Sequence, residues 1–467
     1  MKKNFDVIII GGGPGGYVCA IRAAQLGFNT ACVESRNFLG GTCLNVGCIP
    51  SKSLLNLSES YENAKKNFSN LGIEVSDVKI NLSKMMKAKD KSVSILTKGV
   101  EFLFKKNKVT YLKGLGSIIS ANEVLVEIQG NKTKYQTKNI IISTGSIPMS
   151  LPNVKIDEKN IVSSTGALSF SKIPKNLIVI GGGYIGLEMG SVWKRLGTNV
   201  TVVEFLDHIL PGMDEDISNE FLKILTKQGI NFKLDSKVTG VSTIYNKAVV
   251  DFTNNKSAKR ERIECDKVLV AVGRKANIGE DIIKLGIELN KQKKIKVNNK
   301  FETSIKNIYA IGDVIDKGPM LAHKAGDEGI AVAEILSGQS GHVNYNTIPG
   351  VVYTSPEIAT VGKTEKQIIE EKINYKVGRF PFMANSRAKV NNNAEGFVKI
   401  LADKKTDRVL GVHIIGPHAG DLIAELTLAM EFGASTEDIA RTCHPHPTYS
   451  EAVKEAALSV DKRPIHF

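Results

Sequence analysis

The sequence predicts an α/β fold made of two similar βαβ units and a separate C-terminal domain. The first observation is an internal repeat: residues 175–206 match residues 5–36 at a constant offset of 170 positions, with Gly11 and Gly181 among the matches. The second is that each copy places glycines between a short apolar run and an amphipathic helical stretch, as a βαβ unit does. The third is that such glycine clusters stop at about residue 346.

Each βαβ copy has the same expected elements. The apolar run before the glycines is typical of a buried parallel strand. Gly27 or Gly197 is expected to end the helix that follows. A second, β-branched strand then ends at Glu34 in the first copy and at Glu204 in the second. The two copies are therefore predicted to form Rossmann-like dinucleotide-binding domains.

Further boundaries between a strand and a glycine close the two Rossmann-like regions. They lie at 139–148 and 268–277, and another strand is expected at 307–313. The C-terminal part has short strand-like runs and then helical stretches around 420–432 and 450–459, which predicts an α+β domain. The expected domains are residues 1–146, 147–272, 273–345 and 346–467.

The composition is that of an ordinary soluble protein. Of 467 residues, 42% are apolar and 24% are charged. No apolar stretch approaches the roughly 18 residues that span a membrane, and the run Val7–Ile10 is too short for a signal-peptide core. We therefore expect no membrane association. The expected location is cytoplasmic, or of the mitochondrial-matrix type if a transit segment has been removed.

The chain is basic, with a formal net charge of +14. A basic surface can attract nucleic acid, but charge alone indicates solubility and non-specific contacts. Lys84, Lys87 and Lys91 recur at helical spacing, which is typical of a solvated helix face. No nucleic-acid partner is expected.

The two glycine clusters carry a dinucleotide-binding fingerprint. The pattern G-x-G-x-x-G is formed by Gly11, Gly13 and Gly16 and again by Gly181, Gly183 and Gly186. Its first glycine allows the tight turn, the second lets a pyrophosphate approach the backbone, and the third lets helix and strand pack closely. The start of the helix then offers free N–H groups to the phosphates.

The acids that end the second strands select the cofactor. Glu34 and Glu204 each follow the last fingerprint glycine by 18 residues, where a carboxylate can accept hydrogen bonds from ribose hydroxyls. The segment after Glu204, FLDHILPGMDED, has no Lys or Arg to hold a 2′-phosphate, and its carboxylates would repel one. Both sites are predicted to take an unphosphorylated ribose, which is that of NAD or of FAD.

A pair of cysteines is the second chemical signal. Of six cysteines, only Cys43 and Cys48 are close in sequence, in GGTCLNVGCIPSK (40–52). A zinc pair has similar spacing, but a zinc site needs about four ligands, and no second cluster with that spacing exists. A buried structural pair is the other alternative. Lys52 and a helix that begins at Cys48 would both lower a thiol pKa, which favours a redox-active disulfide.

The third signal is a histidine in CHPHPTYSEAV (443–453). By itself, a histidine between prolines is more often a rigid turn residue than a catalyst. However, Glu451 follows His446 by five residues, and a carboxylate that orients an imidazole is the usual arrangement of a general base. His444 is not expected to act in this way, because no carboxylate is placed comparably for it.

Together, these motifs resemble those of the pyridine nucleotide-disulfide oxidoreductases, and the resemblance covers essentially the whole chain. GTCLNVGCIPSK (41–52) is nearly diagnostic of that family, and HPHPTYSEAV (444–453) is similar to the active-site segment of its dihydrolipoamide-oxidising branch. The resemblance implies an FAD-binding domain (1–146), an NAD-binding domain (147–272), a central domain that completes the FAD site (273–345) and a dimer-interface domain (346–467).

The resemblance also implies the cofactor contacts. For FAD, the corresponding residues are the first fingerprint with Glu34, and Gly41, Thr42, Lys52, Gly116, Thr144, Gly145, Ser146, Asp313, Met320, Leu321, Ala322 and His323. For NAD, they are the second fingerprint with Glu188, Glu204 and Gly273. Asp313 is expected at the ribityl chain, and Lys52 with Glu188 as an ion pair beside the reactive flavin nitrogen. No metal site is expected.

The resemblance further implies an enzyme that oxidises protein-bound dihydrolipoamide to lipoamide with NAD as acceptor. His446 would take a proton from a substrate thiol, the thiolate would attack Cys43, and Cys48 would be left as a thiolate beside the flavin. The expected partners are a second copy of the chain, whose thiol pair His446 would serve, and lipoyl domains. Those domains belong to the acyltransferase core of 2-oxo acid dehydrogenase complexes or to the lipoyl carrier of glycine cleavage.

Two other functions stay open from the sequence. One is an NADPH-linked reductase of a different thiol substrate, although family members of that kind place arginines after the second βαβ unit and this chain has none there. A cofactor-preference assay separates the two. The other is a non-catalytic binding role for the basic surface, which colourless and inactive purified protein would favour.

Overall fold

The computed structural model describes residues 3–245 and 247–467, and the chain divides into two compact units. Unit 1 consists of Met1–Leu54, Asn81–Met149 and Gly273–Tyr345. Unit 2 consists of Leu55–Ile80, Ser150–Val272 and Asn346–Phe467. The first βαβ copy therefore lies in unit 1 and the second in unit 2. The division into four domains stays a prediction.

The sheet of unit 1 has the strand order β3-β2-β1-β6-β5-β4, and β17 pairs with β6. These strands are β1 (Asn4–Ile10), β2 (Thr30–Glu34), β3 (Thr110–Lys113), β4 (Leu115–Ser120), β5 (Glu123–Ile128), β6 (Asn131–Ile142) and β17 (Ile308–Ala310). The pairs of β1 with β2 and β6, of β2 with β3, and of β6 with β17 are parallel, whereas β4, β5 and β6 form antiparallel pairs. A small antiparallel pair, β7 (Ser146–Pro148) with β16 (Arg274–Ala276), lies in the same unit.

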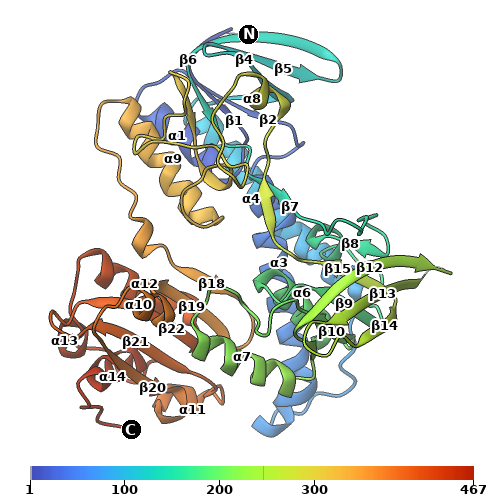
Figure 1. Cartoon of the computed structure of the whole chain (residues 1–467), viewed down its shortest axis with the longest axis vertical. Coiled ribbons are helices and arrows are strands. Elements are labelled where there is room, and N and C mark those ends of the chain that lie inside the picture. Colours follow the sequence, from blue (N-terminus) through green and yellow to red (C-terminus); the bar gives the residue numbers. More distant parts are fainter. Residues whose placement is uncertain (1–2, 246) are drawn as a thin grey trace. The chain divides into compact units, whose positions relative to one another are not determined.

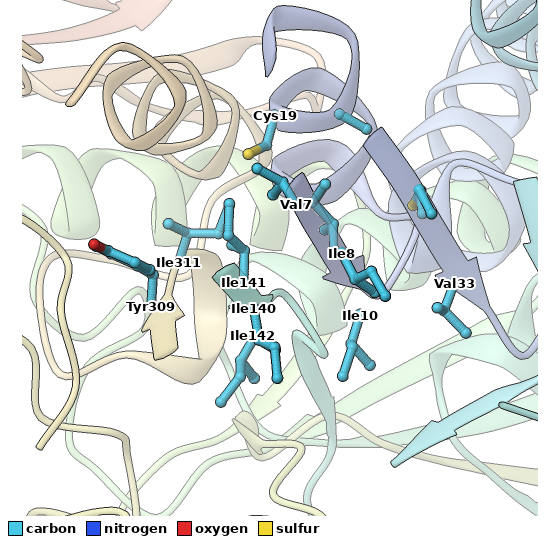
Figure 2. Packing of buried hydrophobic residues seen from close by; sticks show 14 of the residues in the cluster. Val7, Ile8, Ile10, Cys19, Val33, Ile140, Ile141, Ile142, Tyr309 and Ile311 are labelled. Atoms are coloured by element: carbon cyan, nitrogen blue, oxygen red, sulfur yellow. The ribbon is translucent and has the colours of Figure 1, made fainter. Parts of the chain in front are cut away.

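Strand β2, the end of β1 and the end of β6 are buried, and they are mostly apolar because both faces of the sheet are covered there. Figure 2 shows Val7, Ile8 and Ile10 of β1 beside the side chains of β6. In the parallel register, Ile8 pairs with Ile140 of β6. The strands therefore end at the same edge, which places Gly11 next to the chain that leaves β6.

The helices of unit 1 cover this sheet. They are α1 (Pro14–Gln25), α2 (Gly41–Val46), the first turns of α3 (Cys48–Glu62), α4 (Leu82–Lys106), α8 (Glu280–Lys284) and α9 (Ala322–Leu336). As expected, Cys48 is the first residue of α3, and Gly27 follows α1 with a left-handed φ of 92°. Helices α1 and α9 lie side by side (Figure 1), because Gly329 brings its backbone against Gly15. Lys84, Lys87 and Lys91 lie exposed on α4, as predicted.

Unit 2 contains a second parallel sheet with the order β11-β10-β9-β15-β8. Its strands are β8 (Ile161–Val162), β9 (Asn176–Ile180), β10 (Asn199–Val203), β11 (Asn231–Lys233) and β15 (Lys267–Val270). Helices α5 (Ser164–Ala167), α6 (Tyr184–Arg195) and α7 (Glu215–Lys227) connect them, and β12 (Ser236–Ile244), β13 (Lys247–Asn254) and β14 (Arg260–Cys265) form an antiparallel sheet. Gly197 follows α6 with a φ of 104°, as predicted.

The C-terminal part of unit 2 is an antiparallel sheet with helices, in the order β18-β19-β22-β21-β20. The strands are β18 (Gly350–Val352), β19 (Glu357–Gly362), β20 (Tyr375–Pro381), β21 (Phe397–Asp403) and β22 (Val409–Gly416). The helices are α10 (Glu365–Glu370), α11 (Ser386–Val390), α12 (Ala419–Glu431), α13 (Thr436–Arg441) and α14 (Glu451–Val460). This confirms the α+β prediction for residues 346–467. Within the described residues, no helix is both long and apolar enough to cross a membrane.

Candidate active site

The first fingerprint forms a backbone cradle at the end of β1. Gly11 has a φ of 109°, and a Cβ atom there would lie 2.2 Å from the carbonyl oxygen of Ser143. A Cβ on Gly16 would lie 1.7 Å from the Gly11 carbonyl oxygen. Glycine is therefore required at both positions, because no side chain fits. Helix α1 begins after Gly13 without a side-chain cap, which leaves its first N–H groups for an anion.

Glu34 is fixed beside this cradle. Its Oε2 accepts a hydrogen bond of 2.9 Å from the Gly12 N–H, and its Oε1 accepts one of 2.8 Å from the Arg36 N–H. Oε1 also accepts a longer hydrogen bond of 3.4 Å from the Ser35 hydroxyl, whereas Oε2 has a second lone pair that a ribose hydroxyl can use. The nearby Tyr111 hydroxyl is buried and has no hydrogen-bond partner among the described residues. Burial raises its pKa, with a smaller contribution from the charge of Glu34. A glycine cradle, a fixed carboxylate and an orphaned hydroxyl fit the adenosine diphosphate part of FAD.

The strands beside β1 bring the other expected FAD residues of unit 1 together. The Ser146 hydroxyl donates a hydrogen bond of 2.5 Å to Asp313, and the Thr144 hydroxyl donates one of 2.8 Å to the Asn277 carbonyl oxygen. Arg274, which the sequence analysis missed, donates to the Ser146 hydroxyl (2.7 Å) and to its carbonyl oxygen (2.6 Å). Its only signal in the sequence is its position after Gly273. The structure thus joins Ser146 and Asp313, which lie 167 residues apart.

The remaining residues that are expected to contact FAD also belong to unit 1. Gly41 opens α2 with a φ of 56°, and a Cβ there would lie 2.6 Å from the Cα of Gly13. Gly116 packs closely on Val33 and Ile10. Thr42 accepts a hydrogen bond of 3.3 Å from Arg36, and Gly145 has a φ of 70°. Met320, Leu321, Ala322 and His323 lead into α9, which begins at Ala322. Their contacts with FAD stay a prediction.

The second fingerprint repeats the first in unit 2. A Cβ on Gly181 would lie 2.5 Å from the Ala271 carbonyl oxygen, and one on Gly186 would lie 2.4 Å from that of Gly181. Glu204 accepts hydrogen bonds from the Gly182 N–H (2.5 Å) and the Leu206 N–H (2.8 Å), as Glu34 does from the equivalent residues. A hypothetical Cβ on Gly183 has nothing within 4 Å. The cradle therefore fits a dinucleotide with an unphosphorylated ribose, which is the expectation for NAD.

The three residues that are expected around the nicotinamide belong to two different units. Glu188 lies buried on α6 in unit 2, and its carboxylate accepts a hydrogen bond of 3.0 Å from the Tyr353 N–H. Lys52 and Gly273 belong to unit 1. The ion pair between Lys52 and Glu188, and the contribution of Gly273 to the NAD site, stay predictions.

The acidic segment after Glu204 requires a correction. Asp214 is 1% exposed and caps the start of α7, and it pairs at 2.8 Å with the ammonium group of Lys399. Asp216 pairs with the same lysine at 2.8 Å. Lys399, which lies 185 residues from Asp214, also pairs with Glu365 at 2.6 Å, so one positive charge only partly offsets three carboxylates. Asp214 is buried and does not face solvent, whereas Asp207 of the same segment is 63% exposed. The argument against a 2′-phosphate therefore rests on Glu204 and on this exposed acid.

Cys43 and Cys48 form a contacting thiol pair in unit 1. The pKa of Cys43 is raised, first by its side-chain hydrogen bond with Cys48 and then by burial, while Lys52 and the Cys48 N–H lower it. Cys43 is half-buried and Cys48 is exposed. Within the described part of the chain, no group of three or more His, Cys, Asp or Glu residues could hold a metal ion, so the zinc alternative for this pair lacks further ligands.

His446 and Glu451 form the expected dyad in unit 2. The imidazole Nδ1 lies 2.9 Å from Glu451 Oε1, and the His446 side chain is 70% exposed. Burial acts to raise the pKa of Glu451, but hydrogen bonds from the Thr448 N–H and from His446 lower it below its usual value. Glu451 therefore stays a carboxylate at neutral pH. With Nδ1 donating to that carboxylate, Nε2 is the nitrogen that can take a proton from a substrate.

For His444 only the reason for excluding it as a base was wrong, because a carboxylate does contact its imidazole. Its Nε2 lies 2.7 Å from Glu425 Oε1, and its Nδ1 lies 2.9 Å from the Thr442 carbonyl oxygen. The hydrogen bond with Glu425 raises the pKa of His444, against the opposing effect of burial. The side chain is only 4% exposed, which suits an anchor of the loop rather than a base. No sequence signal identified Glu425, because it lies 19 residues away on α12.

Other residues that the sequence analysis missed hold the loop around His446. The Asn385 side chain donates a hydrogen bond of 3.0 Å to the Thr448 carbonyl oxygen. The Tyr449 hydroxyl accepts hydrogen bonds from Asn391 (2.6 Å) and Asn393 (2.9 Å). These contacts hold the segment that joins His446 to Glu451.

Comparisons with known proteins agree with this arrangement. Residues 5–329 match the family described as pyridine nucleotide-disulphide oxidoreductase, and residues 348–457 match the dimerisation domain of that family. The chain is 57% identical over 464 residues to "Dihydrolipoyl dehydrogenase, mitochondrial" from Pisum sativum, covering 99% of this chain and 92% of the relative. It is 56% identical to "Leghemoglobin reductase" from Glycine max, covering 98% and 88%.

Solved structures show the same fold. A flavoprotein disulfide reductase from Escherichia coli, induced by hypochlorous acid, has a TM-score of 0.87 to this chain at 26% sequence identity. The match covers 98% of this chain and 99% of the other. The two-cradle architecture with a C-terminal α+β domain is therefore shared by proteins that differ at most sequence positions.

Proposed function

The chain belongs to the pyridine nucleotide-disulphide oxidoreductase family, and on this premise we propose that it oxidises protein-bound dihydrolipoamide to lipoamide. It is an enzyme that uses FAD and NAD, as dihydrolipoyl dehydrogenases of this family do. The overall reaction is dihydrolipoamide + NAD⁺ → lipoamide + NADH + H⁺. The observation that carries the residue assignment is the thiol pair Cys43 and Cys48, in hydrogen-bonding contact in the unit that holds the first cradle.

The protein residues perform the thiol chemistry. His446 Nε2 removes a proton from one substrate thiol, since the thiolate and not the thiol is the nucleophile. That thiolate attacks the Cys43 sulfur of the oxidised pair, and the electron pair of the broken bond passes to Cys48. The second substrate thiol then displaces Cys43 from the mixed disulfide and releases lipoamide. The resemblance to the family supports this assignment of the two sulfurs, and their hydrogen-bonding contact places them close enough to exchange a disulfide.

FAD, when bound, supplies the two-electron carrier between the reduced cysteine pair and NAD. The first cradle with Glu34, Ser146 and Asp313 would hold it, and the second cradle with Glu204 would hold NAD. The assay that tests the proposal is steady-state turnover of dihydrolipoamide with NAD or NADP, on protein scanned for flavin absorbance. Flavin-free protein without turnover would sink the proposal.

The roles of the two sulfurs have their own test. Reduction of the wild-type protein with a dithiol should add a long-wavelength band from a thiolate next to oxidised flavin. Cys48→Ser should lose that band and Cys43→Ser should keep it, because Cys48 carries the charge. A band that persists in Cys48→Ser means that the two assignments are reversed.

We further propose that the active site is shared between two copies of the chain. The match of residues 348–457 to a dimerisation domain indicates a homodimer. The thiol pair and His446 lie in different units of one chain. A covered flavin leaves only one side of the cysteine pair for the substrate and its base. We therefore assign His446 to the thiol pair of the partner chain.

A mixing experiment tests the shared site. Cys48→Ser and His446→Ala dimers should each be nearly inactive. When the two are co-expressed with random pairing, roughly a quarter of wild-type activity should return, as two-fold symmetry requires. If His446 served its own chain, every site in the mixture would carry one lesion. No recovery in dimers shown to be mixed contradicts the shared site.

The partners and the compartment follow from the same proposal. Dihydrolipoamide presented on lipoyl domains makes the acyltransferase core of a 2-oxo acid dehydrogenase complex, or the lipoyl carrier of glycine cleavage, the macromolecular partner. Because the pea relative is described as mitochondrial, we propose a compartment of the mitochondrial-matrix type. Turnover of isolated lipoyl domains, compared with free dihydrolipoamide, tests the partner class: equal kcat/KM for both would remove the support for lipoyl-domain recognition.

A further inference from the structure

Helix α9 carries a buried ion pair that no step of the proposed mechanism uses. The Lys324 ammonium lies 3.1 Å from Glu328 Oε1, and the two side chains are 1% and 0% exposed. Burial lowers the pKa of Lys324 and raises that of Glu328, and their mutual attraction opposes both shifts. Two charges removed from water in this way are costly, so the pair calls for an explanation other than stability.

Both members of the pair hold the same residue, Gly312. Glu328 Oε2 accepts a hydrogen bond of 2.6 Å from the Gly312 N–H, and Lys324 donates one of 2.9 Å to the Gly312 carbonyl oxygen. Gly312 has a φ of 80° and follows Ile311, which is anchored in the core of unit 1 (Figure 2). The flanking peptide groups of Gly312 are therefore fixed on both sides. The next residue is Asp313, the acid bonded to Ser146.

A third side chain completes the cluster. The Tyr345 hydroxyl donates a hydrogen bond of 2.6 Å to Glu328 Oε1. Each Glu328 oxygen thus has a partner, which is the condition for tolerating a buried carboxylate. Tyr345 is also the last residue of unit 1. The cluster consists of Gly312, Lys324, Glu328 and Tyr345, and we call it the α9 clamp.

The energetics of buried ion pairs distinguish a positioning role for the clamp from a stabilising one. Replacing a buried ion pair with apolar or neutral residues of similar volume is often neutral or stabilising, whereas removing one partner alone is costly. A clamp that served only to stabilise the fold could therefore be replaced at no loss. A clamp that orients a cofactor-binding residue could not be replaced without loss, because its hydrogen bonds fix the direction of a peptide group as well as contributing energy.

We propose that Lys324 and Glu328 are positioning residues for FAD, which fix the Gly312 backbone so that Asp313 is oriented for the cofactor. This inference rests on the proposed function, in which Asp313 belongs to the FAD site. Lys324 and Glu328 act through Gly312 and Asp313. The prediction is that FAD affinity depends on the clamp even where the stability of the fold does not.

Paired substitutions test the clamp without leaving one charge buried alone. Lys324→Met/Glu328→Gln removes the donor to the Gly312 carbonyl but keeps an acceptor for its N–H. Lys324→Met/Glu328→Leu removes both. Deflavinated proteins are titrated with FAD and followed by flavin fluorescence and by the visible flavin spectrum. Loss of one and then both side-chain hydrogen bonds to Gly312 should raise the Kd for FAD by about tenfold and about a hundredfold.

A matched control separates this effect from general destabilisation. Lys399 and Asp214 form another buried ion pair, in unit 2. Lys399→Met/Asp214→Asn should change the thermal unfolding temperature of the deflavinated protein and leave the Kd for FAD unchanged. In Lys324→Met/Glu328→Gln, which keeps an acceptor for the Gly312 N–H, the unfolding temperature should stay level or rise while the Kd increases. Lys324→Met/Glu328→Leu leaves that buried N–H and the Tyr345 hydroxyl without an acceptor, so its unfolding temperature should fall. A Kd that follows the unfolding temperature across all variants would show a merely structural role and overturn the proposal.

Tyr345→Phe provides a second test, which keeps both charges and the volume of the ring. It removes one hydrogen bond to Glu328, so the Kd for FAD should rise by a few-fold, roughly the worth of one such bond. If folded clamp variants and Tyr345→Phe all bind FAD as the wild type does, the clamp has no positioning role. If the wild type itself binds no FAD, the proposed function fails and not this inference alone.

Discussion

The two dinucleotide cradles share their backbone geometry but differ in what the chain does next. Equivalent hydrogen bonds join Gly12 to Glu34 and Gly182 to Glu204. The correspondence extends further, because the Gly40 N–H donates to the Gly12 carbonyl oxygen as the Leu210 N–H does to that of Gly182. After Gly40 and Leu210, the chain follows a different path in each copy.

In unit 1 the chain turns back over the cradle. Gly41 starts α2, and its backbone lies so close to Gly13 that a Cβ would approach the Gly13 Cα to 2.6 Å. In unit 2 the chain runs on through Asp214 into α7, and a Cβ on Gly183 would meet nothing within 4 Å. At the equivalent position of unit 1, a Cβ on Gly13 would lie 3.8 Å from the Gly41 Cα, which is an ordinary contact. Among the described residues, the middle glycine of the fingerprint is therefore covered in unit 1 and open in unit 2. A covered cradle suits a cofactor that stays bound, and an open one suits a cofactor that exchanges in each turnover.

The largest expected effect comes from filling the covered cradle. Gly41→Ala places a methyl group against backbone at a left-handed φ, which costs about 1–3 kcal/mol in strain before the clash is counted. We expect FAD binding to weaken by at least about a hundredfold, by the relation of 1.4 kcal/mol to tenfold. Titration of deflavinated protein with FAD measures it.

Gly183→Ala is the matched control for that prediction. Its methyl group enters open space, so FAD content and unfolding temperature should match the wild type. Only the KM for NAD should rise, because the side chain would meet the pyrophosphate. Equal FAD affinity in Gly41→Ala and Gly183→Ala would break the comparison between a closed and an open cradle.

The next effect distinguishes the two carboxylates. Glu34→Ala and Glu204→Ala each leave two backbone N–H groups without their acceptor, at a cost of about 1–3 kcal/mol if they stay buried. Glu34→Ala should raise the Kd for FAD with little change in the KM for NAD. Glu204→Ala should raise the KM for NAD with little change in the Kd for FAD, and it should reduce the preference for NAD over NADP. Wild-type protein that used both nicotinamide cofactors equally would contradict the assignment of Glu204.

The smallest effect is a difference in acid stability between the copies. Asp214 occupies the position that Leu44 has in the first copy. Burial favours its neutral form, but His413 and Lys399 outweigh it and lower its pKa. A lowered pKa means that Asp214 stabilises the fold above its unfolded pKa of about 3.9 and that this contribution is lost as pH falls through the folded value.

Asp214→Asn should therefore lower the unfolding temperature at pH 7, by an amount corresponding to roughly 1–3 kcal/mol. The gap between variant and wild type should close as the pH falls below about 4. Fluorescence of Trp193, the chain's single tryptophan, follows unit 2, and flavin absorbance follows unit 1. A gap that stays constant from pH 7 to pH 3 would show that ionised Asp214 contributes nothing to unit 2.

The sequence by itself determined the two cradles and the dyad of His446 with Glu451. A cradle depends on glycines at fixed spacing between a strand and a helix, and the requirement arises from short-range clashes such as that of Gly16 with Gly11. The dyad joins residues five positions apart across the start of α14. Contacts of this kind are set by local backbone geometry, so they can be read from spacing.

Only the tertiary structure decided which partners lie across long stretches of chain. His444 meets Glu425, Ser146 meets Asp313, and Asp214 meets Lys399, at separations of 19, 167 and 185 residues. The clamp on Gly312 likewise depends on α9 lying against the end of β17. Such pairs form where packed elements bring charges together away from water, and the free energy of that packing is spread over the whole core. No local sequence pattern therefore predicts these pairs.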